Sequence, residues 1–361
     1  MEAVRDRAEV IGMSIPAVGT RIRHSSVVLL WLASALVVAM TGRAYASEGR
    51  IAFVGGPLND LAGYKIATMW ADGTHAHALV SVIPSQTVLA SPTWSYNRLW
   101  IAYTADPNKN FSSTTPSQIR VVRWDGPRDH AISFTPPWPD WEPKDPTAMA
   151  WSPSGRYLIV AESEEHLSRE WLIMIDLRGG VARPLLQAGG GGKVGHNEIS
   201  SLSFSTDGHY LAVGEVRRDS QGTLQPVLNR LIDVSTARTV RTYPSNVYGI
   251  DIAPDGKHLS FLESRVSPVY LRRADMNFQG RMTVLKFGSG STTGWWVNRM
   301  DYLAYTKWSL DGARIGVTAL HFEGTDDEPS AVPYVVHVRP NGSGFTIPLL
   351  GTGSWAGAFD W

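Results

Sequence analysis

The sequence predicts an all-β fold, a six-bladed β-propeller built from four-stranded blades. One pattern recurs along the chain: an aromatic or apolar anchor residue, a tight turn, and a strand of alternating apolar residues. It returns about every 53 residues, close to the period of other propeller repeats. No helical periodicity lies between the copies. The anchors are Trp94, Trp151, Phe204, Ile252, Trp308 and Trp361.

The turn after each anchor has the composition of a β-hairpin. Asp-Gly or Ser-Gly stands between two apolar strands, as at Gly155, Gly208 and Gly312, and glycine supplies the positive φ that such turns need. Two further strands follow in each repeat. The expected examples are residues 65–70 with 75–80, 118–124 with 129–134, and 171–176 with 181–186. A blade of four strands cannot bury both its faces alone, so the six blades should stack around a ring.

The sixth copy of the pattern is divided between the two ends of the chain. Its anchor is Trp361, and the strand that should follow stands at residues 50–54. We therefore expect the C-terminal strand to pair beside residues 50–54. This pairing would close the ring and cover two sheet edges that otherwise invite aggregation.

These repeats resemble those of the TolB-type propellers. The resemblance lies in Trp308-Ser-Leu-Asp-Gly312 and its equivalents, and in the strand and turn at residues 66–74, and it covers residues 47–361. It implies a single propeller domain without the N-terminal α/β domain that TolB carries, and protein or peptide partners. Similar blades precede the hydrolase domain of prolyl-oligopeptidase-like peptidases, but the six repeats occupy residues 47–361, and no Gly-x-Ser-x-Gly elbow occurs.

Residues 1–46 are predicted to be a signal peptide, cleaved after Ala46. Arginines precede an apolar run at residues 27–40, and Ala44-Tyr-Ala46 has the form of a cleavage site. The run is shorter than the 20 or so residues of a membrane span. Either Met1 or Met13 could be the start. We expect a periplasmic or secreted protein with no membrane span after cleavage; the alternative is an N-terminal anchor in the inner membrane.

Composition narrows the class of protein further. The 361 residues include 33 basic and 33 acidic side chains and no cysteine. Removal of residues 1–46, with five basic and three acidic residues, leaves the mature chain with a formal net charge of −2. The absence of a basic excess argues against nucleic acid as a partner, and the absence of cysteine excludes disulfides and thiol chemistry. We expect a monomer held together by its core.

The loops that enter the inner strands are the expected functional region, because loops carry function more often than strands do. The loop at residues 135–146 holds Trp138 and Trp141 on a proline-stiffened frame with Asp140. Rigid aromatics beside carboxylates suit a peptide, a sugar or a basic side chain. The alternative is that these tryptophans cap the core.

Two more loops offer candidate binding residues. The glycine-rich loop at residues 287–301 presents Trp295, Trp296 and Arg299, although one tryptophan could pack inward. The loop at residues 189–198 ends in His196, Asn197 and Glu198, where a histidine beside a carboxylate could serve acid–base work or a metal. No second histidine stands at ligand spacing, which favours a polar loop that bonds its own backbone.

A third pattern crosses the repeats. Three neighbouring blades carry a glutamate at the same position after their second strand: Glu162, Glu215 and Glu263. These carboxylates should form an arc near the channel mouth, which could hold a cation through oxygen ligands or receive a basic partner. The alternative is ion pairing with arginines nearby in the sequence, namely Arg169, Arg217, Arg218 and Arg265.

Two functions are consistent with these features. The first is a non-enzymatic exported module that binds a protein or peptide partner of the cell envelope through the loops around the channel. The alternative is a propeller enzyme, a lyase or hydrolase that could act on sugars, with its site at the channel mouth. The sequence predicts no cofactor, beyond the cation that the channel could hold, and no catalytic residue, which favours the binding module.

Overall fold

The chain divides after residue 46, and residues 47–361 form one compact unit. A computed structural model describes residues 49–57, 65–81, 88–106, 117–126, 128–138, 146–164, 169–188, 197–218, 224–263, 269–287, 294–296, 306–323, 330–344 and 354–361. The predicted signal peptide and its cleavage site lie outside the described residues. None of the described segments forms a helix that is long and apolar enough to cross a membrane.

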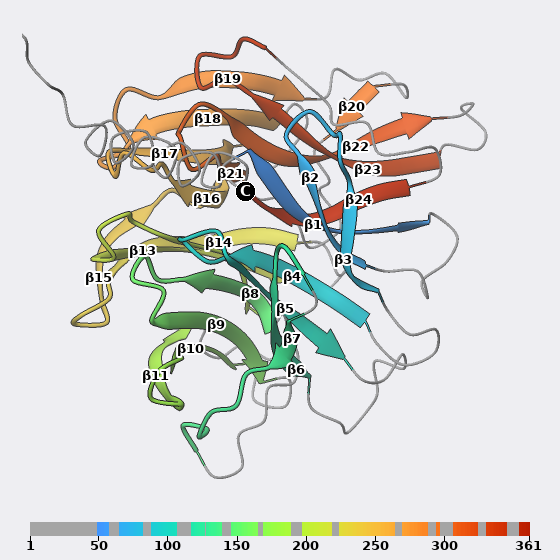
Figure 1. The fold of residues 1–361 in the computed structure, drawn as a ribbon. Coiled ribbons are helices and arrows are strands. Elements are labelled where there is room, and N and C mark those ends of the chain that lie inside the picture. The colour runs from blue at the N-terminus through green and yellow to red at the C-terminus, as the bar shows by residue number, and fades with distance from the viewer. Residues whose placement is uncertain are drawn as a thin grey trace, which may run out of the picture. The chain divides into compact units, whose positions relative to one another are not determined.

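The described strands form six antiparallel four-stranded sheets, which are the six predicted blades (Figure 1). Blade 1 contains β24 (Ser354–Asp360), β1 (Arg50–Pro57), β2 (Lys65–Trp70) and β3 (His77–Ser81). Blade 2 contains β4 (Val88–Trp94), β5 (Trp100–Asp106), β6 (Gln118–Arg123) and β7 (Asp129–Ala131). Blade 3 contains β8 (Pro146–Trp151), β9 (Tyr157–Glu164), β10 (Arg169–Asp176) and β11 (Val181–Ala188).

The second half of the chain repeats this order. Blade 4 contains β12 (Asn197–Phe204), β13 (Tyr210–Arg218), β14 (Leu224–Asp233) and β15 (Arg238–Tyr243). Blade 5 contains β16 (Val247–Ile252), β17 (His258–Glu263), β18 (Val269–Asp275) and β19 (Met282–Phe287). Blade 6 contains β20 (Gly294–Trp296), β21 (Thr306–Trp308), β22 (Ile315–Glu323) and β23 (Ser330–Val338).

Ring closure occurs as the divided sixth repeat predicts. The C-terminal strand β24 pairs antiparallel with β1, with Asp360 opposite Ala52 and Phe359 opposite Phe53. In Figure 1 the red C-terminal strand lies beside the blue first strand. Strand β24 also contacts β4 of blade 2 and β22 and β23 of blade 6. The last strand of the chain therefore joins the first blade to the sixth.

Hydrogen bonds in the hairpin explain the recurring motif. In blade 6 the Ser309 hydroxyl donates to Asp311 Oδ1 at 2.6 Å and accepts from the Arg314 N–H at 2.9 Å. Asp311 Oδ1 also accepts from the Ala313 N–H at 2.9 Å, and Gly312 has a φ of 68°. Serine and aspartate thus satisfy the backbone of a turn that needs a residue with positive φ.

The core lies between the blades. Each of five clusters of buried apolar side chains joins one blade to the next, from the blade 1–blade 2 contact to the blade 5–blade 6 contact. Phe359 of β24, Trp361 directly after it and Val335 of β23 belong to the first cluster, which links blade 6 to blade 1. Each blade buries its faces on its neighbours, so the ring is the smallest unit with a complete core.

Two segments differ from the sequence prediction. Strand β7 ends at Ala131, because the chain then crosses to blade 3, where the Thr135 N–H donates to Gly180 O at 2.7 Å and Thr135 O accepts from the Ala182 N–H at 2.9 Å. Trp295 and Trp296, which we expected in a loop, lie in the short strand β20, which pairs with the far half of β22. Both β20 and β21 pair with β22, so the inner edge of blade 6 is built from two short strands.

Candidate functional sites at the two ends of the channel

The inner edge of each blade, which in blade 6 is built from β20 and β21, has two ends that carry different side chains. In blade 3, Pro146 at the start of β8 lies opposite Glu162, which in turn lies opposite Trp171. Trp151 at the end of β8 lies opposite Leu158, next to the hairpin. We call the end where inner strands begin the entry end, and the end with the anchors and hairpins the turn end.

An aromatic pair marks the entry end of blade 3. The rings of Trp138 and Trp171 meet edge to face, with 5.0 Å between their centroids. Both side chains are half-buried and pack against the apolar cluster between blades 2 and 3. Trp138 therefore caps the core, as the structural alternative proposed, and still leaves part of its ring exposed. The two interpretations of this loop are compatible.

The three glutamates of the arc are buried on the second strands of blades 3, 4 and 5. Glu215 forms an ion pair with Arg230, and Glu263 with Arg272 and with Arg281 Nη1, the latter at 2.8 Å. Arg230 and Arg272 lie on the neighbouring strand of the same blade, and Arg281 directly precedes β19 of blade 5. The arginines that the sequence suggested, Arg169, Arg217, Arg218 and Arg265, have side chains outside the described part of the structure.

Register explains these partners. Glu215 lies opposite Leu228, and Arg230 is two residues further along the same strand. Glu263 lies opposite Tyr270, and Arg272 is again two residues further. Residues two apart in a strand share a face, so each pair is a diagonal cross-strand contact. Burial raises the pKa of Glu215, although the charge of Arg230 opposes this effect.

The remaining predicted binding residues are only partly described. Asn197 and Glu198 are the first two residues of β12, and Trp295 and Trp296 belong to β20; only their strand positions are described. Asp140, Trp141, His196 and Arg299 lie outside the described residues. Among the described residues, no three His, Asp or Glu side chains converge as a metal site.

The turn end holds a pocket of about 120 Å³ that the sequence analysis did not anticipate. Its wall consists of the six anchors, contributed by all six blades. Its rim consists of the residues two positions after the anchors: Tyr96, Pro153, Thr206, Pro254 and Leu310. The repeat motif thus builds a pocket that has a mostly apolar rim and a mostly aromatic wall.

The residue immediately before each anchor also points to a common level of the channel. Blades 2, 3 and 4 place Thr93, Ala150 and Ser203 there, and blades 5, 6 and 1 place Asp251, Lys307 and Asp360. All six line the pocket. One half of the pocket floor therefore carries charged side chains, and the other half carries small side chains.

Lys307 lies between the two carboxylates. Its Nζ is 3.5 Å from Asp360 Oδ1 and 3.8 Å from Asp251 Oδ1, and it donates a hydrogen bond to Leu202 O at 3.3 Å. Burial raises the pKa of Asp251 to about 6, although Lys307 and the Trp308 N–H favour its charged form. Burial opposes the charge of Lys307, but Asp360 and Asp251 outweigh it, so the pKa of Lys307 is raised.

The same side chains link adjacent blades. Asp251 Oδ2 accepts from the Trp308 N–H at 2.6 Å, and Asp360 Oδ2 accepts from the Trp94 N–H at 2.6 Å. Ser203 Oγ accepts from the Ile252 N–H at 2.9 Å. In each case a residue before one anchor binds the backbone of the next anchor around the ring. Asp251 and Asp360 of the charged floor therefore also connect neighbouring blades.

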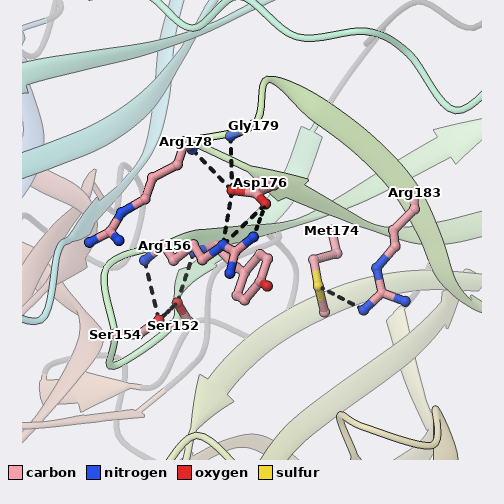
Figure 2. A network of polar contacts seen from close by, with 9 residues as sticks. Ser152, Ser154, Arg156, Met174, Asp176, Arg178, Gly179 and Arg183 are labelled. Atoms are coloured by element: carbon pink, nitrogen blue, oxygen red, sulfur yellow. Dashed lines mark hydrogen bonds and ion pairs between the residues drawn. The ribbon is translucent and has the colours of Figure 1, made fainter.

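Outside the pocket, ion pairs hold the hairpins of the turn end. Figure 2 shows one such network in blade 3, where Arg156 from the β8–β9 hairpin reaches Asp176 at the end of β10. Arg156 Nη2 is 2.7 Å from Asp176 Oδ2, and Asp176 Oδ1 accepts from the N–H groups of Arg178 and Gly179. The hydrogen bond from Arg156 holds the pKa of Asp176 well below its usual range.

A buried histidine fastens blade 6 to blade 1. His337 of β23 donates from Nε2 to Ala71 O, accepts at Nδ1 from Arg314 Nη1 at 3.0 Å, and packs edge-on against Trp361. These contacts require a neutral ring. Burial lowers the pKa of His337 to about 4.

This histidine should make stability depend on pH. Since its folded-state pKa is lower than its unfolded value of 6.5, its contribution is complete above pH 6.5 and is lost as the pH falls towards 4, by up to about 3 kcal/mol. His337→Gln keeps a donor and an acceptor but does not titrate. Urea unfolding measures the free energy of unfolding at pH 7 and at pH 4.5. The decrease between these two pH values should be smaller in the variant than in the unaltered chain, and equal decreases would contradict this role. Asp251 titrates in both proteins, so its effect cancels.

Comparisons with known proteins agree with this fold. Residues 192–224 match the WD40 family (WD domain, G-beta repeat). TolB from Acinetobacter baumannii superposes with a TM-score of 0.60 at 16% identity, over 97% of this chain and 74% of that chain. The putative TolB from Agrobacterium tumefaciens gives 0.52 at 12% identity, over 86% of this chain and 97% of that chain. No curated protein sequence matches the chain. Residues 47–361 therefore form a six-bladed β-propeller whose fold is similar to that of the TolB proteins.

Proposed function

We propose that the chain is an exported, non-catalytic binding module of the cell envelope, and that its entry end binds a protein or peptide partner. The observation that carries this proposal is the Trp138–Trp171 pair. Two half-buried aromatic rings are fixed by the core beneath them, so binding would cost little side-chain entropy. Tryptophan is among the residues that contribute most to protein interfaces.

The charges of the glutamate arc support binding more than catalysis. Glu215 and Glu263 are held by arginines of their own blades. A carboxylate held in this way is poorly placed to exchange a proton with a substrate. The TolB-like fold and the predicted signal peptide are consistent with a partner in the periplasm or outside the cell.

Photo-crosslinking in envelope extracts would test the proposal. We expect the partner to be captured by the full chain, and Trp138→Ala and Trp171→Ala each to weaken its binding by about 30-fold or more, as for a central aromatic contact. Trp100→Ala is the matched control, because Trp100 is also half-buried and packs edge-on against an aromatic ring, that of His130, but lies at the turn end. Unchanged capture by a folded Trp138→Ala/Trp171→Ala protein would overturn the proposal.

A further inference from the structure

The pocket at the turn end is not used by the proposed function, which concerns the opposite end of the channel. Its wall is aromatic: Trp94, Trp308 and Trp361 are all more than nine-tenths buried, and Trp151 stands beside them. The Trp151 indole N–H donates to Thr93 O at 3.1 Å. The indole N–H groups of the other three tryptophans are buried and have no acceptor among the described residues.

The pocket floor adds another incompletely used donor. An ammonium group can donate three hydrogen bonds. Lys307 makes one to Leu202 O, and its distances of 3.5 and 3.8 Å to the two carboxylates are longer than ordinary N–H···O hydrogen bonds. The carboxylates in turn are strong acceptors. The lining therefore offers both donors and acceptors to a molecule that carries both.

The charge balance selects against an ionic ligand. Asp251 and Asp360 contribute two negative charges, and Lys307 contributes one positive charge between them. A second positive charge belongs to Arg98, whose guanidinium carbon is 5.3 Å from the centre of the Trp94 ring and whose field reaches Lys307. An added cation would meet Lys307 and Arg98, and an added anion would meet the two carboxylates. An uncharged ligand meets neither cost.

Size and shape restrict the ligand further. A cavity of about 150 Å³ accepts one benzene ring, and the present volume of about 120 Å³ is of the same order. The pocket therefore encloses one six-membered ring at most, and the substituents of that ring must lie against the floor or at the open rim. The apolar rim and the aromatic wall suit a ring that has C–H faces, and the polar floor suits hydroxyl groups at its edge. Small-molecule sites commonly combine an apolar lining with a few polar groups in this way.

We propose that the turn-end pocket binds one uncharged hexopyranose ring. The C–H face of the sugar packs against the indole rings, and its hydroxyls enter the charged half of the floor. There they donate to the carboxylates of Asp251 and Asp360 and accept from Lys307. The small half, formed by Thr93, Ala150 and Ser203, leaves the space that the ring occupies.

Nuclear magnetic resonance of the full chain with ¹⁵N-labelled tryptophan would test this site, because the indole N–H signals report directly on the wall. The probes are methyl glucopyranoside, methyl galactopyranoside and N-acetylglucosamine, with glucuronate and glucosamine as charged versions of the same ring. We expect at least one uncharged sugar to shift the indole signals, and the charged versions to bind at least about tenfold more weakly. Absence of any shift, or equal binding of a charged version, would overturn the proposal.

A rim variant separates pocket binding from surface binding. Tyr96 lines the rim and is 40% exposed, so the Tyr96→Ala protein should fold normally. Its affinity for the sugar should be lower by at least about fivefold. Tyr210 is 36% exposed and does not line the pocket, which makes Tyr210→Ala the matched control with unchanged affinity. Equal effects of the two variants would place the sugar elsewhere. These results are independent of Trp138 and of the partner proposed for the entry end.

Discussion

Lys307→Met is expected to lower the free energy of unfolding at pH 7 by about 3–5 kcal/mol, the usual cost of removing one partner from a buried ion pair. Lys307 is the cation between the buried carboxylates of Asp251 and Asp360. Without it, both carboxylates would repel each other in a poorly hydrated site. Urea unfolding of the variant and the unaltered chain at pH 7 measures the difference.

The pH dependence of this loss provides a second test. Asp251 has a raised pKa of about 6, so its buried charge costs stability as the pH rises through that value, and this cost disappears as the carboxyl is protonated. Loss of Lys307 would raise the pKa further. The destabilisation should therefore be smaller at pH 5 than at pH 7. A constant loss at both values would show that lost packing of the lysine stem, and not charge, is responsible.

Two control variants isolate the ion pair. Lys257 is an exposed lysine in the hairpin of blade 5, and Lys257→Met should change stability by no more than about 0.5 kcal/mol. Asp251→Asn combined with Lys307→Met removes one of the two uncompensated charges and should recover part of the loss. A folded Lys307→Met protein that is as stable as the unaltered chain at pH 7 would contradict the assignment.

Trp361→Ala is expected to cost about 3–5 kcal/mol, as for other buried aromatic side chains. Trp361 is 5% exposed and belongs to the apolar cluster that joins blades 1, 2 and 6. Its ring also packs against His337, and Gly316 of β22 leaves the space for it, because a Cβ there would stand 2.8 Å from Phe359 and 3.2 Å from Trp361. The substitution therefore opens a cavity at the place where blade 6 meets blade 1 and closes the propeller.

The measurement is again the free energy of unfolding, and the conservative variant provides the control. Trp361→Phe keeps an aromatic ring in the cluster and should recover more than half of the loss. If Trp361→Ala changed stability by less than about 1 kcal/mol, the contact of β24 with blade 6 would not contribute to closure in the way that its burial indicates.

Much of the fold could be predicted from the sequence because the information is local and repeated. A serine, an aspartate and a glycine in a short hairpin satisfy their own backbone, as Ser309, Asp311 and Gly312 do in blade 6 and Ser205, Asp207 and Gly208 do in blade 4. Repetition also predicted the closure of the ring. One departure from the predicted strands has its cause outside its own blade. Strand β7 is short because Thr135 pairs with blade 3.

The candidate sites were less predictable. The sequence identified Trp138 and the three glutamates, but the described arginine partners follow from strand register and not from nearness along the chain. It missed the turn-end pocket, although aligning the residues before the anchors would have shown Asp251, Lys307 and Asp360 in an otherwise small or apolar position.

The sequence alone therefore determined the repeat, the anchors, the number of blades and the closing strand, since each depends on turn chemistry and on the alternation of apolar residues. Tertiary structure alone decided that Asp251, Lys307 and Asp360 meet, since they are about 50 residues apart and belong to three blades. Only the closed ring brings both carboxylates within 4 Å of the Lys307 ammonium group and buries them, and those two effects create the pocket floor.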